Sequence, residues 1–152
     1  MPQAELEKII SKMIQVELEA MRYYRKATEV MQDEGAIFHF NLLADEELEH
    51  ARSFYEIYPG NDLAPFEKLV AEDSQNRPIE TIDIGLMARL DERQALQLAL
   101  RFEKEVEGKL RSMAMEIHNE AARAVILQNA ESTQNHYQLL AEDYQRLYGH
   151  LD

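Results

Sequence analysis

Apolar residues recur at spacings of three and four over four long stretches of the chain, which is the spacing of one face of an α-helix. The predicted helices cover residues 3–33, 36–58, 91–118 and 119–148. Their ends follow from local signals: Gly35 ends the first helix, and Pro59-Gly60 ends the second. Asp91, followed three residues later by Gln94, predicts a capping box at the start of the third. The pattern therefore predicts an all-α chain.

The segment between the second and third predicted helices, about residues 59–90, has a different composition. It holds three of the four prolines and several turn-forming residues, with one short helix expected over residues 65–73. Helices of about 25–30 residues are about 40–45 Å long, and a connection of about 30 residues can cross such a length. We therefore expect a four-helix bundle with one long crossover, in which helices two and three run parallel.

Composition limits the class of protein. The 152 residues fit one domain, residues 1–152, and the absence of cysteine excludes thiolate metal sites. With 16 basic and 29 acidic residues the net charge is −13, which disfavours a nucleic-acid partner. No stretch approaches 18 apolar residues and the start of the chain is not typical of a signal peptide, so we expect no membrane span and a cytoplasmic location.

Each predicted helix carries a carboxylate inside its apolar stripe. These residues are Glu17, Glu47, Glu103 and Glu131. A buried, unpaired carboxylate is costly, and four that converge repel one another, so a bound cation is the natural compensation. The alternative interpretation is that one or two stripes are misphased by a residue, in which case those glutamates face water.

The second predicted helix adds a histidine to this set. Glu47 and His50 are three residues apart, so both side chains can reach one metal ion or a pair of ions. A carboxylate with an imidazole suits iron, manganese or zinc. His136 lies five residues after Glu131 and is expected to point about 140° away from it, outside the site.

The two halves of the chain also resemble each other faintly. Placing residues 13–27 on 99–113 superimposes Glu17 on Glu103. Placing LLADEELEH on ILQNAESTQ superimposes Glu47 on Glu131. The matches agree with a duplicated helix pair.

With these residues the chain resembles the ferritin-like superfamily, specifically short rubrerythrin-like proteins without a rubredoxin domain. In that family two helices each supply a Glu, and the other two each supply Glu-x-x-His. The resemblance implies a ferritin-like four-helix bundle whose metal ligands are Glu17, Glu47, His50, Glu103, Glu131 and Gln134. Gln134 stands where the family has its second histidine, which implies that one of two metal positions binds less tightly.

The resemblance implies a di-iron carboxylate protein that binds two Fe(II) ions and reacts with O2 or peroxide, as a ferroxidase or peroxidase does. Manganese or zinc also suits the ligands, and a homodimer is expected from the family. Two alternatives stay open. One is a non-catalytic bundle with a degenerate metal site, acting as a scaffold or partner-binding protein; the other is a single structural zinc at Glu47 and His50.

Overall fold

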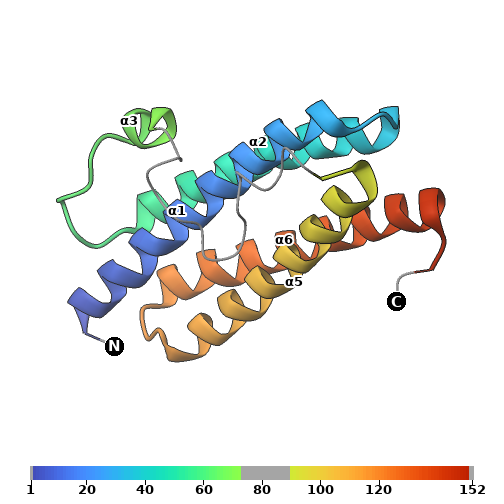
Figure 1. The fold of residues 1–152 in the computed structure, drawn as a ribbon. Coiled ribbons are helices and arrows are strands. Elements are labelled where there is room, and N and C mark those ends of the chain that lie inside the picture. The colour runs from blue at the N-terminus through green and yellow to red at the C-terminus, as the bar shows by residue number, and fades with distance from the viewer. Residues whose placement is uncertain (1, 73–89, 151–152) are drawn as a thin grey trace.

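The structure, a computed structural model, describes residues 2–72 and 90–150, and every regular element in them is helical (Figure 1). The elements are α1 (Gln3–Ala27), the 3-10 turn η1 (Thr28–Val30), α2 (Glu34–Ile57), α3 (Phe66–Ala71), α5 (Glu92–Glu116) and α6 (Glu120–Tyr148). The prediction of an all-α chain with four long helices is therefore confirmed. Most of the predicted connection, residues 73–89, lies outside the described residues. Within the described residues, no helix has both the length and the apolar character that a membrane span requires.

Polar caps start the two helices of the second half. Asp91 accepts a hydrogen bond from the backbone N–H of Gln94 at 2.8 Å, and the Gln94 side chain accepts one from the backbone N–H of Asp91 at 3.0 Å. The predicted capping box is thus confirmed. Asn119 caps α6 in a similar way, because its Oδ1 accepts from the backbone N–H of Ala122 at 2.9 Å.

The boundary between α1 and α2 differs from the prediction. The first helix ends at Ala27 and is followed by η1, rather than continuing to Asp33. Asp33 instead begins α2, because its Oδ2 accepts a hydrogen bond from the backbone N–H of Ala36 at 2.8 Å. A short acidic side chain at this position is a favoured N-cap, so Gly35 lies in the first turn of α2 instead of ending α1.

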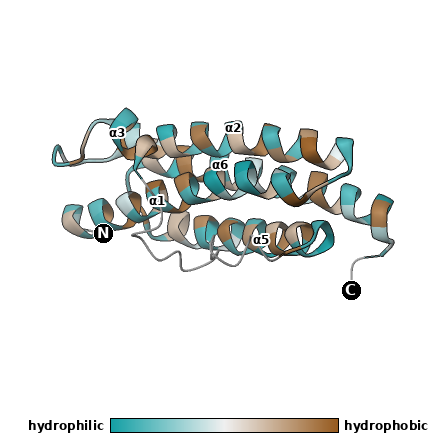
Figure 2. Ribbon diagram, turned by 45° about the horizontal axis from the view of Figure 1, so that its top comes forward, coloured by the Kyte–Doolittle hydropathy of each residue, from teal (hydrophilic) through white to brown (hydrophobic). Residues whose placement is uncertain are grey.

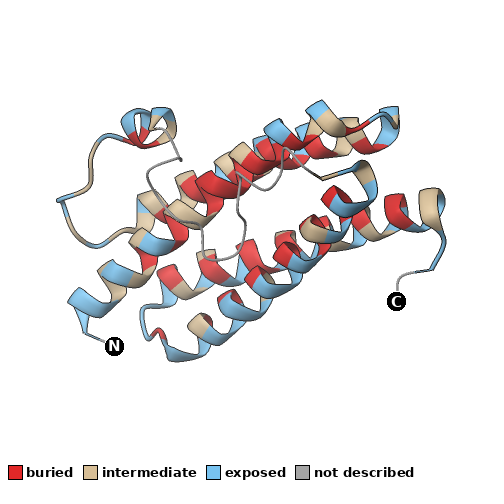
Figure 3. Cartoon of the chain, viewed as in Figure 1, coloured by how far each residue is buried: buried red, intermediate tan, exposed pale blue. Residues whose placement is uncertain are grey.

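The four long helices form two antiparallel pairs, α1 with α2 and α5 with α6, and the pairs also meet where α2 packs on α6 (Figure 1). α2 and α5 run in the same direction, as one long crossover predicts. The apolar residues lie on the facing sides of the helices, and the buried residues coincide with them (Figures 2 and 3). Tyr23 connects α1 to α5, since its hydroxyl donates a 2.6 Å hydrogen bond to the carbonyl of Ala95.

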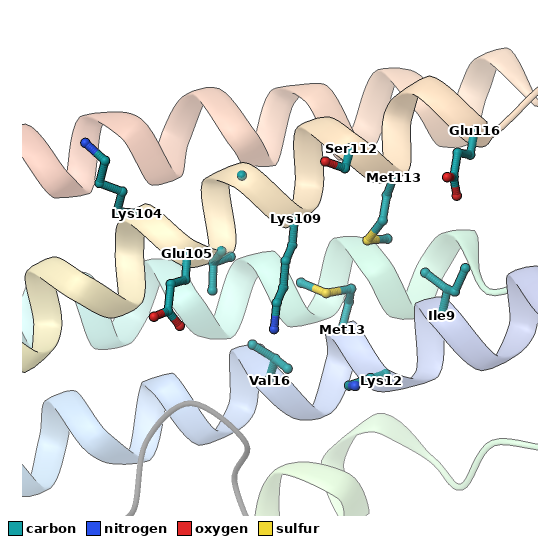
Figure 4. A pocket seen from close by; sticks show the side chains of 12 residues that line it. Ile9, Lys12, Met13, Val16, Lys104, Glu105, Lys109, Ser112, Met113 and Glu116 are labelled. Carbon is teal, nitrogen blue, oxygen red and sulfur yellow. The ribbon is translucent and has the colours of Figure 1, made fainter.

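The two pairs diverge between α1 and α5, where an apolar groove of about 660 Å³ opens (Figure 4). Met13 and Val16 of α1 face Met113 of α5 across it. Gly108 lies on its wall, and a Cβ added there would meet no atom within 4 Å. The closest packing between the two pairs is therefore that of α2 on α6.

Candidate metal centre

Three carboxylates and two imidazoles meet in the interior of the bundle. Glu17 comes from α1, Glu47 and His50 from α2, Glu103 from α5, and His136 from α6. Glu17 and Glu103 have no exposed surface, and the other three are between 1% and 8% exposed. We call these five residues the Glu/His centre. Each long helix contributes to it, so the whole bundle sets its geometry.

The Glu/His centre is nearly symmetric about Glu47. Its Oε1 lies 3.6 Å from Nδ1 of His50 and 3.0 Å from Nδ1 of His136. Each imidazole also has its own outer carboxylate: His50 Nδ1 is 3.6 Å from Glu17 Oε2, and His136 Nδ1 is 3.6 Å from Glu103 Oε1. The two rings are stacked, with centroids 5.2 Å apart and planes 10° from parallel. Two Glu–His pairs therefore share one central carboxylate.

Partners outside the Glu/His centre orient both rings. His50 Nε2 and Ser132 Oγ form a 2.9 Å hydrogen bond. His136 Nε2 donates to Glu46 Oε2 at 3.1 Å. Because each Nε2 is engaged on the outer side, each Nδ1 is directed at the carboxylates inside. Metal-binding histidines usually have such a partner on the nitrogen that does not bind the ion.

Six buried atoms of the centre have no hydrogen-bond partner in the described part of the chain. They are both carboxylate oxygens of Glu17, Oε1 of Glu47, Oε2 of Glu103 and Nδ1 of both histidines. The 3.0 Å contact between Glu47 Oε1 and His136 Nδ1 is an ion-pair distance that lacks hydrogen-bond alignment. Buried polar atoms are almost always hydrogen-bonded, so a cluster of exceptions requires an explanation. Oxygen and imidazole nitrogen donors suit iron, manganese or zinc, and the donor atoms of Glu47, His50 and His136 lie within 4.8 Å of one another. The residues present therefore fit a bound metal ion.

The electrostatics of the centre agree with a competition between protons and metal. Burial and the charges of Glu17 and Glu103 raise the pKa of Glu47 well above its ordinary value. Burial also opposes ionisation of Glu17, but interactions with Glu47 and His50 outweigh it and lower its pKa. Burial favours the neutral ring of His136, yet the carboxylates of Glu103, Glu46 and Glu47 raise its pKa to about 12. The metal-free centre therefore holds protons where an ion would bind.

Tyr24 fixes the outer carboxylate on α5. Its hydroxyl is fully buried and donates a 2.6 Å hydrogen bond to Glu103 Oε1. Burial, the charges of Glu103 and Glu47 and this hydrogen bond raise the pKa of Tyr24 well above its ordinary value, so the phenol stays a donor. The Tyr24 ring also packs edge-on against Phe40, with centroids 5.0 Å apart. Tyr24 thus holds Glu103 Oε1 beside His136, while Glu103 Oε2 has no hydrogen-bond partner within the described residues.

The prediction for the fourth helix was wrong in its phase. Glu131 and Gln134 are both exposed, and Gln134 Oε1 accepts a 3.3 Å hydrogen bond from Arg111 at the surface. His136, which was expected outside the site, is 3% exposed and faces the other carboxylates. The expected angle of about 140° between positions 131 and 136 agrees with this, but the residue that points outward is Glu131.

A signal in the sequence could have identified His136. Glu103 follows Glu17 by 86 residues, and His136 follows His50 by the same 86. The alignment that paired Glu47 with Glu131 used a spacing of 84 and so slipped by two residues. At a constant spacing of 86, the position equivalent to Glu47 is occupied by Thr133. Thr133 is buried, and its Oγ1 donates to the carbonyl of Asn129 at 2.7 Å, which leaves three carboxylates in the centre rather than four.

Comparisons with known proteins do not add a family. No protein-family model, no curated protein and no solved structure matches this chain. What the Glu/His centre can bind therefore follows from its own geometry: a buried group of carboxylates and imidazoles that could hold a metal ion.

Proposed function

We propose that the Glu/His centre binds two divalent metal ions, with iron as the physiological metal, and that the protein uses them to react with O2 or peroxide. Glu17 with His50 would hold one ion, Glu103 with His136 the other, and Glu47 would be shared. The observation that carries this proposal is the set of buried, inward-facing oxygen and nitrogen atoms without hydrogen-bond partners. The near-symmetric arrangement about Glu47 favours two ions over one. Two divalent ions also neutralise three buried carboxylates, which is otherwise a costly arrangement.

The surrounding residues prepare the centre for the metal. Ser132 and Glu46 hold the two imidazoles with Nδ1 inward, and Tyr24 holds Glu103. Burial of all five members would limit the access of water to bound ions. When bound, iron supplies the electron transfer that reactions with O2 or peroxide require. The all-helical bundle and the resemblance to rubrerythrin-like proteins support this choice of metal and oxidant.

A second candidate is a single structural ion, such as zinc. It is favoured by one observation: ligand atoms of Glu47, His50 and His136 lie within 4.8 Å of one another. Such an ion would use the middle of the centre and leave Glu17 and Glu103 outside the coordination shell. The two candidates therefore differ in stoichiometry and in their dependence on the outer carboxylates.

An anaerobic Fe(II) titration of the metal-free protein, followed by calorimetry, tests the proposal. Two ions per chain support the di-metal centre, and one ion favours the single-ion site. Glu47→Ala is expected to abolish stoichiometric binding in either case. Glu131→Ala is the matched control, because it makes the same substitution at an exposed position of α6. Unchanged binding by Glu47→Ala, or equal losses in both variants, would refute the proposed site.

Admission of O2 to the iron-loaded protein then tests the reaction. The expected result is a rise in near-ultraviolet absorbance from ferric iron, faster than in a solution of Fe(II) with Glu47→Ala protein. Equal rates in the two samples would mean that the centre binds Fe(II) without accelerating its oxidation by O2, and the oxidative part of the proposal would fail.

A further inference from the structure

A second candidate binding site lies on the outer surface, where α5 and α6 meet. It is a groove of about 380 Å³, lined by Arg93, Gln97, Leu100, Arg101 and Lys104 of α5 and by Tyr137 and Tyr144 of α6. We call it the α5–α6 groove. Three of its seven lining residues are cations and none is a carboxylate, although acidic residues outnumber basic ones by 29 to 16 in the chain. The groove is therefore a locally cationic surface on an acidic protein, which favours an anionic ligand.

The Tyr144 hydroxyl lies at one end of the groove and has a hydrogen available to donate. Tyr144 is 3% exposed, and its oxygen accepts hydrogen bonds from Arg93 Nε at 3.0 Å and Gln97 Nε2 at 3.1 Å. With two donors on the oxygen, the hydroxyl hydrogen is left to donate. Within the described residues, that hydrogen has no acceptor. An oxyanion in the groove would supply one.

Aromatic rings hold two of the cations in place. The Arg93 guanidinium lies 5.7 Å from the ring centroid of Tyr144 and 5.4 Å from that of Tyr148. Lys104 Nζ lies 5.4 Å from the ring centroid of Tyr137. A cation–π contact orients a cation without neutralising it, so the charge of Lys104 still attracts an anion. The side chains are therefore arranged before a ligand arrives.

The cations form a row along α5 rather than a single cluster. Arg93, Gln97, Arg101 and Lys104 are four, four and three residues apart, so they follow one side of the helix over about 16 Å. A single small carboxylate can contact one end of such a row. A linear anion with several charges along its length can contact both ends.

We propose that the α5–α6 groove binds an oligophosphate chain, with Tyr144 donating to phosphate oxygens at one end and Arg101 and Lys104 binding them at the other. Phosphate oxygens match the fork of arginine and the point charge of lysine, and successive phosphates carry charge along a line. Free oligophosphate and the phosphate chain of a nucleotide share this chemistry. The proposal concerns the outer surface and does not depend on the metal proposed for the Glu/His centre.

Calorimetric titration of the metal-free full-length protein with phosphate, pyrophosphate, tripolyphosphate and ATP, at one ionic strength, tests the proposal. The expected affinity increases with each added phosphate and falls when salt is raised. Equal affinity for tripolyphosphate and ATP identifies the phosphate chain alone as the ligand, whereas tighter binding of ATP identifies a nucleotide. Absence of saturable binding, or equal affinity for phosphate and tripolyphosphate, would overturn the proposal.

Matched variants separate the groove from overall charge. Arg101→Glu should weaken tripolyphosphate binding by about tenfold or more, because it replaces a charge-assisted contact by repulsion. Lys109→Glu makes the same change of sign at an exposed position of α5 that lines the apolar groove between α1 and α5. It should change the affinity for tripolyphosphate by less than about twofold. Tyr144→Phe keeps the ring and should weaken binding by about threefold to tenfold. Equal losses in Arg101→Glu and Lys109→Glu, or full affinity in Tyr144→Phe, would refute the assigned contacts.

Discussion

Replacement of Glu17 by glutamine should destabilise the metal-free protein and weaken its response to metal. Glu17 has no exposed surface, and burial opposes its ionisation, but interactions with Glu47 and His50 outweigh this cost and lower its pKa. A lowered pKa means that the ionised side chain stabilises the folded protein more than its neutral form does. Removal of a charged partner from such interactions costs about 1–3 kcal/mol. We therefore expect Glu17→Gln to lower the free energy of unfolding of the metal-free protein at neutral pH by about 2 kcal/mol, or its Tm by about 4–8 °C for a chain of this size.

The same variant should respond less to metal. At a free ion concentration 100 times Kd, each occupied site contributes about 2.7 kcal/mol, which corresponds to a rise in Tm of about 5–11 °C. Glu17→Gln removes a ligand from one of the two proposed positions, so its rise should be at most about half that of the wild type when both are measured at the same ion concentration. A general loss of stability would lower the Tm with and without metal and leave the rise on adding metal unchanged, so a diminished rise identifies the lost ligand.

Thermal unfolding followed by far-ultraviolet circular dichroism, with chelator or with Mn(II), measures both effects. Glu131→Gln is the matched control, since the same change at an exposed position should alter neither the metal-free Tm nor the rise with Mn(II). A metal-free Glu17→Gln protein that is more stable than the wild type, or an undiminished rise on adding Mn(II), would refute the reasoning.

Three further predictions concern pH, ligand orientation and packing. Because the pKa of His136 is raised to about 12, the metal-free centre carries a proton there at neutral pH that an ion must displace; the apparent Zn(II) affinity should therefore rise about tenfold per pH unit, and calorimetry in buffers of different ionisation enthalpy should count at least one released proton. A pH-independent affinity would contradict this. Ser132→Ala removes the hydrogen-bond partner of His50 Nε2 and should lower metal affinity by about 10–100-fold with little change in the metal-free Tm; unchanged affinity would mean that Ser132 does not position the ring. Tyr23→Phe removes the 2.6 Å hydrogen bond to the carbonyl of Ala95 and should lower the free energy of unfolding in urea by about 0.5–1.5 kcal/mol, while metal stoichiometry is retained; a variant as stable as the wild type would show that this hydrogen bond makes no net contribution.

Much of the fold and most of the centre could be predicted from the sequence, because local signals and apolar periodicity agree there. The cap at Asp91 marks the start of α5, and the stripes of α1, α2 and α5 place Glu17, Glu47 and Glu103 inside. Glu17 and Glu103 have apolar residues one turn away on both sides, and Glu47 follows Leu43 by one turn, so the phase of each helix is well determined. His50 then follows from its spacing to Glu47.

The fourth helix was harder to phase, because two adjacent apolar residues suggest different stripes. Ile126 is fully buried, but its neighbour Leu127 is 40% exposed, and the stripe drawn through Leu127 leads to Glu131. The true buried face includes polar side chains that satisfy themselves on their own helix: Asn129 donates to the carbonyl of Val125 at 2.8 Å, and Thr133 donates to that of Asn129. Such local hydrogen bonds let polar residues be buried at little cost. A stripe drawn through apolar residues alone therefore leaves out Asn129 and Thr133, although both are buried.

Anomalous diffraction at the iron edge, from crystals of the protein loaded anaerobically with Fe(II), tests the central claim most directly. The account predicts two peaks inside the bundle, one between Glu17 and His50 and one between Glu103 and His136, with Glu47 adjacent to both. A single peak between the two histidine rings would replace the di-metal centre by the single-ion site. Peaks confined to surface carboxylates such as Glu131, with none among the five buried residues, would contradict the claim that this bundle is built around a metal.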